Sequence, residues 1–201
     1  MSSDQTFRAV LIVTLVSVVL IAVSGRLRAR TNEKLDRRQE GLFMLVTLRP
    51  VGLVLWVGII AYTIDPASMA WSAVPLPEWI RWMGLPVGAV AVGLLAWTLR
   101  SLGKNLTDTV VTRREHSLVT RGPYRFVRHP FYDSVALTVL AAGLIMANGF
   151  ILGAGSLFIC LFILRTRKEE ENLLARFGDP YRSYVERTGR FLPRKVHRVS
   201  G

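Results

Sequence analysis

Apolar residues in this chain are gathered into five runs, and charged residues fill the segments between them. The runs cover approximately residues 7–25, 42–64, 82–99, 131–147 and 150–164. The first three are long enough for a helix to cross a hydrocarbon core ~30 Å thick, because an α-helix rises ~1.5 Å per residue. The last run is short, so its helix must continue beyond Leu164. The pattern predicts an all-α integral membrane protein with about five transmembrane helices.

Turn residues mark where these helices are expected to begin and end. Asn148 and Gly149 separate the last two runs and predict a tight C-terminal helical hairpin. Pro130 opens the fourth run, and proline suits the first turn of a helix, where a missing N–H costs little. His129 would then lie at a helix N-terminus, where free N–H groups and the helix dipole favour an anion. Gly178 is expected to end the last long helix, and a short polar helix follows it.

The composition fits this segregation of apolar and charged residues. The chain is 51% hydrophobic, yet its net charge is +12. A soluble protein with five such helices would have too little polar sequence to cover its core. The first run is not expected to be a cleaved signal peptide, because no small-residue cleavage site precedes the basic segment that follows. No nucleic-acid motif is present, and we expect no nucleic-acid partner.

The distribution of lysine and arginine predicts the orientation in the membrane. Residues 26–40 contain six of them, residues 103–128 contain six, and residues 165–201 contain ten. The alternate segments contain almost none, with Arg8 before the first span and Arg81 in the second loop. Because basic loops stay in the cytoplasm, we expect the N-terminus outside and the C-terminus inside.

Several residues inside the apolar runs bear on helix packing and function. Gly84, Gly88 and Gly93 are small and permit close helix contact. Cys160 is the single cysteine, so the chain can form neither an internal disulfide nor a thiolate metal site, and we expect this side chain to pack. Arg49 precedes a proline within the second run. An intramembrane arginine is costly and often functional, so Arg49 either binds substrate or extends to the cytoplasmic surface.

Residues 116–132, HSLVTRGPYRFVRHPFY, bring many functional groups into one short segment between two apolar runs. They include two histidines, three arginines and two tyrosines. Arginines beside an apolar run often mark only the end of a span, and a histidine before proline is often only a cap. Neither explanation accounts for so many different groups in one place.

This segment resembles the signature of the isoprenylcysteine carboxyl methyltransferase family. The first half of the signature is His-x-Leu-Val-Thr-x-Gly-x-Tyr followed by Arg-His-Pro-x-Tyr. The second half is present as Glu169, Glu170, Leu173, Phe177, Gly178, Tyr181 and Tyr184, and it closes with Phe191, Leu192 and Pro193. The resemblance extends over about residues 102–193, and one departure is Ser134, where the family usually has glycine. We therefore divide the chain into N-terminal transmembrane helices, 1–101, and a methyltransferase region, 102–201.

The resemblance implies an integral-membrane methyltransferase that uses S-adenosylmethionine. It places cofactor contacts on His116, Ser117, Leu118, Val119, Tyr124, His129, Pro130, Phe131, Tyr132 and Glu169. Apolar and aromatic groups would hold the adenosine, the N–H groups and imidazole around His129 would meet the carboxylate, and Glu169 would meet the ammonium. These residues fall in segments predicted to be cytoplasmic, so the active site should face the cytoplasm.

The same resemblance implies roles for the acceptor side of the site. Arg165 would be catalytic and bind the acceptor, since a guanidinium can hold a carboxylate through two hydrogen bonds. Glu170 would be a further catalytic residue or, more simply, a support for the others. Methyl transfer depends on orientation and proximity and needs no metal. The expected partners are membrane lipids and a lipophilic or membrane-delivered acceptor.

Two other functions are compatible with parts of the sequence. A membrane reductase of the sterol type also has an Arg-His-Pro-x-Tyr element but binds a nicotinamide cofactor. A non-catalytic membrane protein could also retain the fold, and Ser134 is the one hint of it. The identity of the acceptor, whether a carboxylate, an amine or a thiol, stays open.

Overall fold

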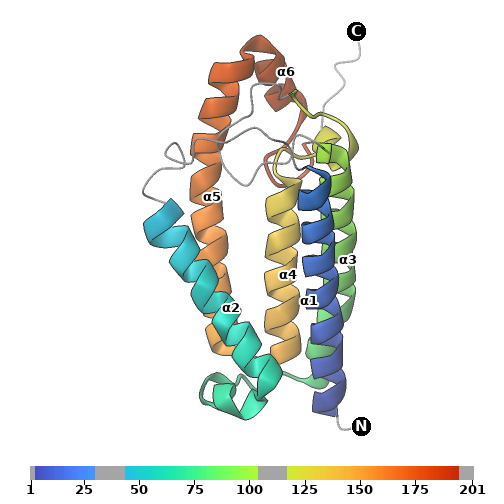
Figure 1. Ribbon diagram of the computed structural model, residues 1–201, viewed down its shortest axis with the longest axis vertical. Helices are drawn as coiled ribbons and strands as arrows, with labels where there is room; N and C mark the ends of the chain where they lie inside the picture. The colour runs from blue at the N-terminus through green and yellow to red at the C-terminus, as the bar shows by residue number, and fades with distance from the viewer. Residues whose placement is uncertain (1–2, 30–43, 104–116, 195–201) are drawn as a thin grey trace.

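The structure, a computed structural model, describes residues 3–29, 44–103 and 117–194, and within these ranges it consists of helices joined by short connections (Figure 1). The helices are α1 (Ser3–Arg28), η2 (Met44–Leu48), α2 (Arg49–Ile64), η3 (Pro66–Ser72), α3 (Glu78–Leu102), η5 (Gly122–Arg125), α4 (Pro130–Met146), α5 (Gly149–Phe177) and α6 (Asp179–Arg187). In the described residues, β-pairing is limited to isolated bridges.

The described part of each of the five apolar runs is helical, which confirms the predicted all-α membrane fold. Four helical segments are long and apolar enough to cross a membrane: Ser3–Arg28, Val46–Ile64, Glu78–Leu102 and Gly149–Phe177. Helix α4 is equally apolar but has 17 residues. Whether it counts as a fifth span therefore stays a prediction, as does the division of the chain at residue 101.

The helix ends lie where the turn residues predicted them. Helix α4 begins at Pro130 after His129, and α5 ends at Phe177 before Gly178, whose φ of 57° suits glycine. Asn148 caps α5 by accepting a 3.1 Å hydrogen bond from Ile151 N and donates one of 3.0 Å to Met69 O. The helical hairpin of α4 and α5 is thus confirmed, and its turn is tied to η3.

Pro50 changes the geometry of the second apolar segment rather than interrupting it. It occupies the first turn of α2, and the preceding turn, η2, is a π-helix. Proline lacks the N–H that would continue the regular hydrogen-bond pattern, and wider turns commonly accommodate such a loss.

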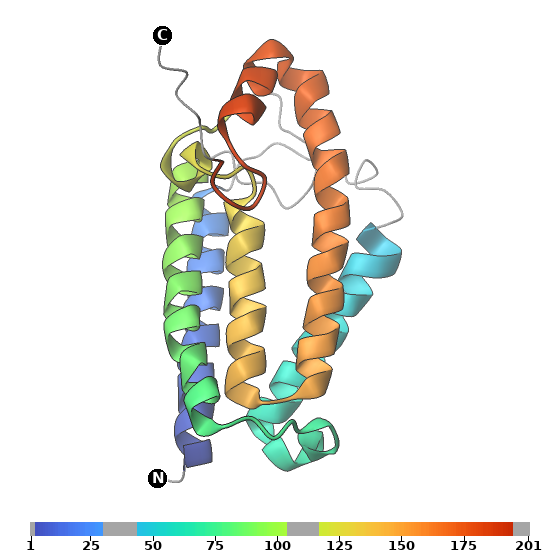
Figure 2. The same cartoon turned by 180° about the vertical axis from the view of Figure 1, so that it is seen from behind.

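Helices α1, α3 and α4 form a closely packed group, and α5 lies beside α4 (Figures 1 and 2). Helix α2 crosses α5 obliquely. Helix α5 extends past the ends of its neighbours, where α6 folds back toward α4. Gly84 and Gly88 lie at close helix contacts, as predicted. A Cβ at Gly84 would lie 3.0 Å from Ala141 O on α4, and one at Gly88 would lie 3.1 Å from Thr14 Cγ2 on α1. Gly93 differs, since no described atom lies within 4 Å of its Cβ position.

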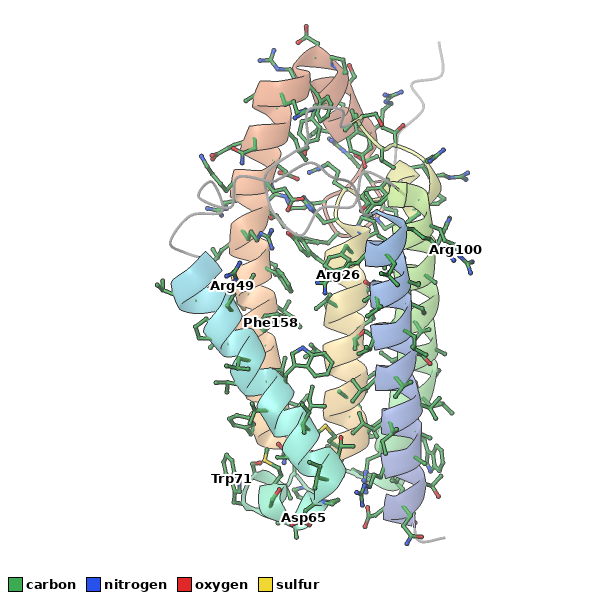
Figure 3. All side chains as sticks on the ribbon, viewed as in Figure 1. Arg26, Arg49, Asp65, Trp71, Arg100 and Phe158 are labelled. Atoms are coloured by element: carbon green, nitrogen blue, oxygen red, sulfur yellow. The ribbon has the colours of Figure 1, made fainter. Side chains whose placement is uncertain are left out.

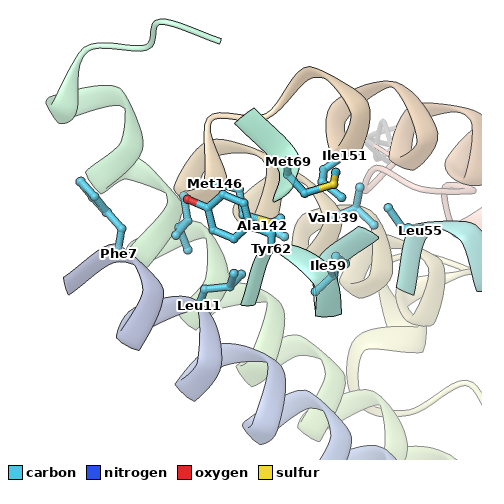
Figure 4. Packing of buried hydrophobic residues seen from close by; sticks show 11 residues of the cluster. Phe7, Leu11, Leu55, Ile59, Tyr62, Met69, Val139, Ala142, Met146 and Ile151 are labelled. Carbon is cyan, nitrogen blue, oxygen red and sulfur yellow. The ribbon is translucent and has the colours of Figure 1, made fainter. Parts of the chain in front are cut away.

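The main hydrophobic core lies in the half of the bundle away from α6 (Figure 4). Its buried members are Phe7, Leu11, Leu55, Ile59, Tyr62, Met69, Val139, Ala142, Ile145, Met146 and Ile151. Arg81 closes this end by donating from Nε to Ile145 O at 3.1 Å and pairing with Asp4 at 2.9 Å. Cys160 is exposed on α5, so its predicted packing role was wrong.

Candidate active site

Four parts of the chain, from two stretches that are distant in sequence, meet at the α6 end of the bundle. They are the segment that contains η5 (117–129), the start of α4, the part of α5 beyond its apolar run, and α6 with the residues that follow it (Figures 1 and 2). The apolar run holds α5 upright in the bundle, so its polar continuation projects past α4 toward the other three. Polar side chains on α5 are thereby brought beside the His129 segment.

Glu170 on α5 is contacted by three basic side chains. Its Oε1 accepts hydrogen bonds from Arg128 Nε at 2.9 Å and from Arg190 Nε at 3.2 Å, and it lies 3.2 Å from His129 Nε2. Arg190 Nη2 also donates to Glu170 Oε2. The carboxylate therefore joins α5 to both the segment before α4 and the segment after α6.

The residues after α6 also pair with the segment before α4 through the backbone. Arg128 N donates to Gly189 O at 2.9 Å, and His129 N donates to Arg190 O at 3.1 Å. The guanidinium of Arg128 reaches the same segment, donating from Nη1 to Thr188 O at 2.6 Å. We call residues 188–191 the C-terminal segment. Its backbone contacts fix the position of His129 from one side.

Aromatic rings hold the start of α4 against α5. The ring of Tyr132 stacks on Phe162 at 4.7 Å and lies parallel to the His129 ring at 5.4 Å. Phe191 of the C-terminal segment contacts His129 from another direction, with ring centroids 5.8 Å apart. His129 is 5% exposed, so its orientation is set by these neighbours and by Glu170.

Glu169 and Arg165 lie one helical turn apart on α5, on the side of Tyr132. The Tyr132 hydroxyl donates a 2.7 Å hydrogen bond to Glu169 Oε2. Arg165 Nε is buried and has no hydrogen-bond partner among the described residues. A buried guanidinium N–H without an acceptor is costly, so this position is suited to an anionic or polar ligand group. A free donor beside an oriented carboxylate fits the amino-acid end of S-adenosylmethionine or a polar acceptor.

Buried tyrosines support the η5 turn from α6. Tyr184 donates from its hydroxyl to Tyr124 O at 2.7 Å. Burial raises the pKa of Tyr124 well above its ordinary value, and the nearby negative charge of Glu169 raises it further. Burial also raises the pKa of Tyr184. Both phenols consequently stay protonated even at pH values above 10, where an exposed tyrosine ionises.

Comparison with known proteins points to the same family. The isoprenylcysteine carboxyl methyltransferase (ICMT) family matches residues 84–175. This match covers slightly less than half of the chain, and over these residues the chain resembles the ICMT family. The match begins within α3 and includes the η5 segment, α4 and most of α5, so the family resemblance predicted from the two motifs is confirmed.

Individual relatives match about half of this chain. The protein-S-isoprenylcysteine O-methyltransferase of Dictyostelium discoideum is 31% identical over 123 residues, which is 53% of this chain and 52% of that protein. The cobalt-zinc-cadmium resistance protein CzcN of Cupriavidus metallidurans is 28% identical over 117 residues, 57% of this chain and 54% of that protein. This chain thus spans about half the length of these curated relatives.

A solved structure shows that the fold is shared as well. The eukaryotic intramembrane Ras methyltransferase ICMT superposes with a TM-score of 0.53 at 24% sequence identity. The match covers 72% of this chain and 51% of that one. The helical arrangement is therefore that of the ICMT fold.

The residues predicted to bind the cofactor lie at different depths in this candidate site. His129, Pro130 and Tyr132 are buried, whereas Phe131 and Tyr124 are partly buried. Leu118 and Val119 are partly buried in the chain leading to η5, and Ser117 is exposed there; His116 lies outside the described residues. Their cofactor-binding roles, and the catalytic roles of Arg165 and Glu170, stay predictions.

Arg49 lies at the exposed start of α2, beside α5 (Figure 3). Its neighbour Leu48 is buried in a cluster with Tyr132 and Phe162, which brings this end of α2 to the edge of the site. A substrate-binding role for Arg49 stays a prediction.

Sequence reasoning missed three residues that shape the site: Arg128, Phe162 and Arg190. Arg128 was part of the family motif but had no assigned role. Phe162 had a detectable signal, because Phe158, Phe162, Arg165 and Glu169 are spaced by four, three and four residues and so share one helix face. Arg190 had no such signal, since its contact with Glu170 depends on the chain folding back after α6. Among the described residues, no cluster of histidine, cysteine and carboxylates could hold a metal ion.

Proposed function

We propose that this protein is an integral-membrane methyltransferase that uses S-adenosylmethionine and acts on a lipophilic or membrane-delivered acceptor. The cofactor would supply an electrophilic methyl group on a sulfonium. The match to the ICMT family supports the reaction class, and the single observation that supports the site is the placement of Arg165 one helical turn from Glu169. These two residues offer an oriented carboxylate and a buried, unpartnered N–H beside the rings of Tyr132 and His129.

The protein's own residues would contribute binding and orientation. Glu169, held by Tyr132, would accept hydrogen bonds from the cofactor ammonium, and Arg165 would hold the polar group of the acceptor. The segment 117–129 would cover the adenosine with Leu118, Val119 and Tyr124. Since transfer of a methyl group needs close in-line alignment, fixing these groups on packed helices would account for most of the catalysis.

Binding measurements on the purified, detergent-solubilised protein test this proposal. Calorimetry should detect S-adenosylmethionine and its demethylated product, and NADPH should not bind. Binding of NADPH without S-adenosylmethionine would favour the sterol-type reductase instead. Membranes incubated with cofactor carrying a labelled methyl group would then identify the acceptor as a carboxylate, an amine or a thiol.

We propose an N-terminus outside, a C-terminus in the cytoplasm and an active site facing the cytoplasm. The distribution of basic residues supports this orientation: Arg26, Arg49 and Arg100 lie toward the α6 end, and Asp65 and Trp71 lie at the other (Figure 3). The test uses a Cys160→Ala background with one new cysteine, at exposed Ser183 on α6 or at Ser72 in η3. A membrane-impermeant thiol reagent should label intact cells only through position 72; labelling through position 183 would reverse the orientation.

A further inference from the structure

Glu170 links two segments that are 60 residues apart, and its partners differ in how they are held. Arg128 is 10% exposed and also donates to the carbonyls of Thr188 and Val185. Arg190 is 37% exposed, and its two side-chain hydrogen bonds within the described residues both go to Glu170. Arg128 is therefore fixed by several partners, whereas Arg190 holds the carboxylate from the solvent side.

The contact with Glu170 bears on the protonation of His129. A carboxylate only accepts hydrogen bonds, so the 3.2 Å contact with Nε2 requires the proton on that nitrogen. When the imidazole is neutral, Nδ1 then has its lone pair free. Rotation of the Glu170 carboxylate would remove this preference, because neither tautomer would have a charged partner.

Arg190 limits that rotation. Its two donors contact both oxygens of Glu170, and this fork fixes the plane of the carboxylate as well as its position. Arg128, by comparison, donates to only one of the two Glu170 oxygens, Oε1. Without the two Arg190 donors, Glu170 Oε2 would be hydrated by water instead. The carboxylate could then rotate, and His129 would lose its oriented acceptor.

We infer that Arg190 is a positioning residue of this site: through Glu170 it holds the imidazole of His129 in one tautomer and orientation for ligand binding. The inference rests on the proposed function for the identity of the ligand, S-adenosylmethionine. It assigns Glu170 a positioning role too, since this carboxylate is occupied by three protein side chains.

Two variants and a matched control test the inference in the full-length, detergent-solubilised protein. Arg190→Gln removes the charge and the fork, and Arg190→Lys keeps the charge without the fork. Arg182→Gln is the control, because Arg182 is an exposed arginine of α6 with a 3.5 Å surface contact to Asp179. Calorimetry with S-adenosylmethionine gives affinity, and nitrogen NMR of labelled histidine gives the tautomer without requiring activity. The chain has three histidines, so a His129→Gln variant assigns the signal.

We expect Arg190→Gln to weaken S-adenosylmethionine binding about tenfold and to convert His129 from one tautomer to a mixture. Arg190→Lys should recover part of both effects, and Arg182→Gln should change neither. Adding Arg190→Gln to Glu170→Gln should cause no further loss, because Arg190 acts through Glu170. A merely structural role would lower the thermal midpoint while the folded variant kept its affinity and its tautomer.

Two further outcomes distinguish a failure of this inference from a failure of the proposed function. Wild-type protein that binds no S-adenosylmethionine would overturn the proposed function and, with it, the ligand-binding part of the inference. Normal wild-type binding with unchanged affinity and tautomer in Arg190→Gln would overturn the inference alone. If Arg190→Gln does not fold, Arg190→Lys decides the matter in the same way.

Discussion

The hydroxyl of Tyr132 and the carboxylate of Glu169 join α4 to α5 through a 2.7 Å hydrogen bond. The two residues are 37 positions apart in sequence and lie on antiparallel helices of the same hairpin. Tyr132 also stacks on Phe162 of α5, so its hydroxyl approaches Glu169 from a fixed direction. An oriented carboxylate at this point is the feature on which the proposed cofactor site depends.

Tyr132→Phe should weaken S-adenosylmethionine binding by roughly tenfold and also lower the thermal midpoint. The substitution keeps the stacked ring but removes a hydrogen bond to a charged group, worth about 1.5–3 kcal/mol. Calorimetry and thermal unfolding measure the two effects separately. Tyr62→Phe, in the core away from the site, is the matched control and should leave affinity unchanged. Equal affinity in the wild type and Tyr132→Phe would mean that Glu169 needs no support.

Glu169→Gln and Arg165→Lys should impair different steps. Glu169→Gln removes the negative charge that would face the cofactor ammonium, so the affinity for S-adenosylmethionine should fall by about one to two orders of magnitude. Arg165→Lys keeps the charge but loses the planar fork, so cofactor affinity should hardly change while methyl transfer to the membrane acceptor falls steeply. Calorimetry and labelled-methyl transfer measure these quantities. Near-normal turnover in both variants would indicate a surface pair worth only ~0.3–0.5 kcal/mol, and equal losses of cofactor binding would place Arg165 in the cofactor site.

Gly84→Ala should destabilise the helix bundle, and Gly93→Ala should not. A Cβ at Gly84 would lie 2.5 Å from Ile145 Cγ1 and 3.0 Å from Ala141 O, so α3 and α4 would have to separate. Such overpacking typically costs about 1–3 kcal/mol. At Gly93 no described atom lies within 4 Å of the Cβ position. Alanine there should therefore raise helix stability by about 0.5–1 kcal/mol. Thermal unfolding in one detergent compares them, and equal midpoints would refute this packing.

The α6 end should lose stability as the pH rises above 10. Burial raises the pKa values of Tyr124, Tyr181 and Tyr184 above the ordinary 10.0. The unfolded chain releases these protons near pH 10 while the folded chain keeps them, so their contribution is complete below pH 10 and declines above it. Tyrosinate absorbance and circular dichroism, followed together, should change in one transition. Ionisation near pH 10 with the helices intact would show that water reaches these phenols.

The sequence by itself determined the helices, their ends and the resemblance to the ICMT family. Pro130, Asn148 and Gly178 act on the backbone within one or two turns, so their effects can be recognised without knowing what packs nearby. Apolar runs likewise report membrane burial directly, because hydrocarbon excludes charged side chains wherever the helix lies in the bundle.

The tertiary structure alone decided which side chains meet. Adjacent Glu169 and Glu170 look equivalent in sequence, but they contact different partners, Tyr132 on α4 for one and Arg190 beyond α6 for the other. Their directions depend on the rotation of α5 about its axis and on the path of the chain after α6. Both are set by long-range packing, including the stacking of Tyr132 on Phe162 and the pairing of residues 126–129 with 189–190. Because contacts between distant segments leave no local pattern, the C-terminal segment could not be placed over His129 before the helices were packed.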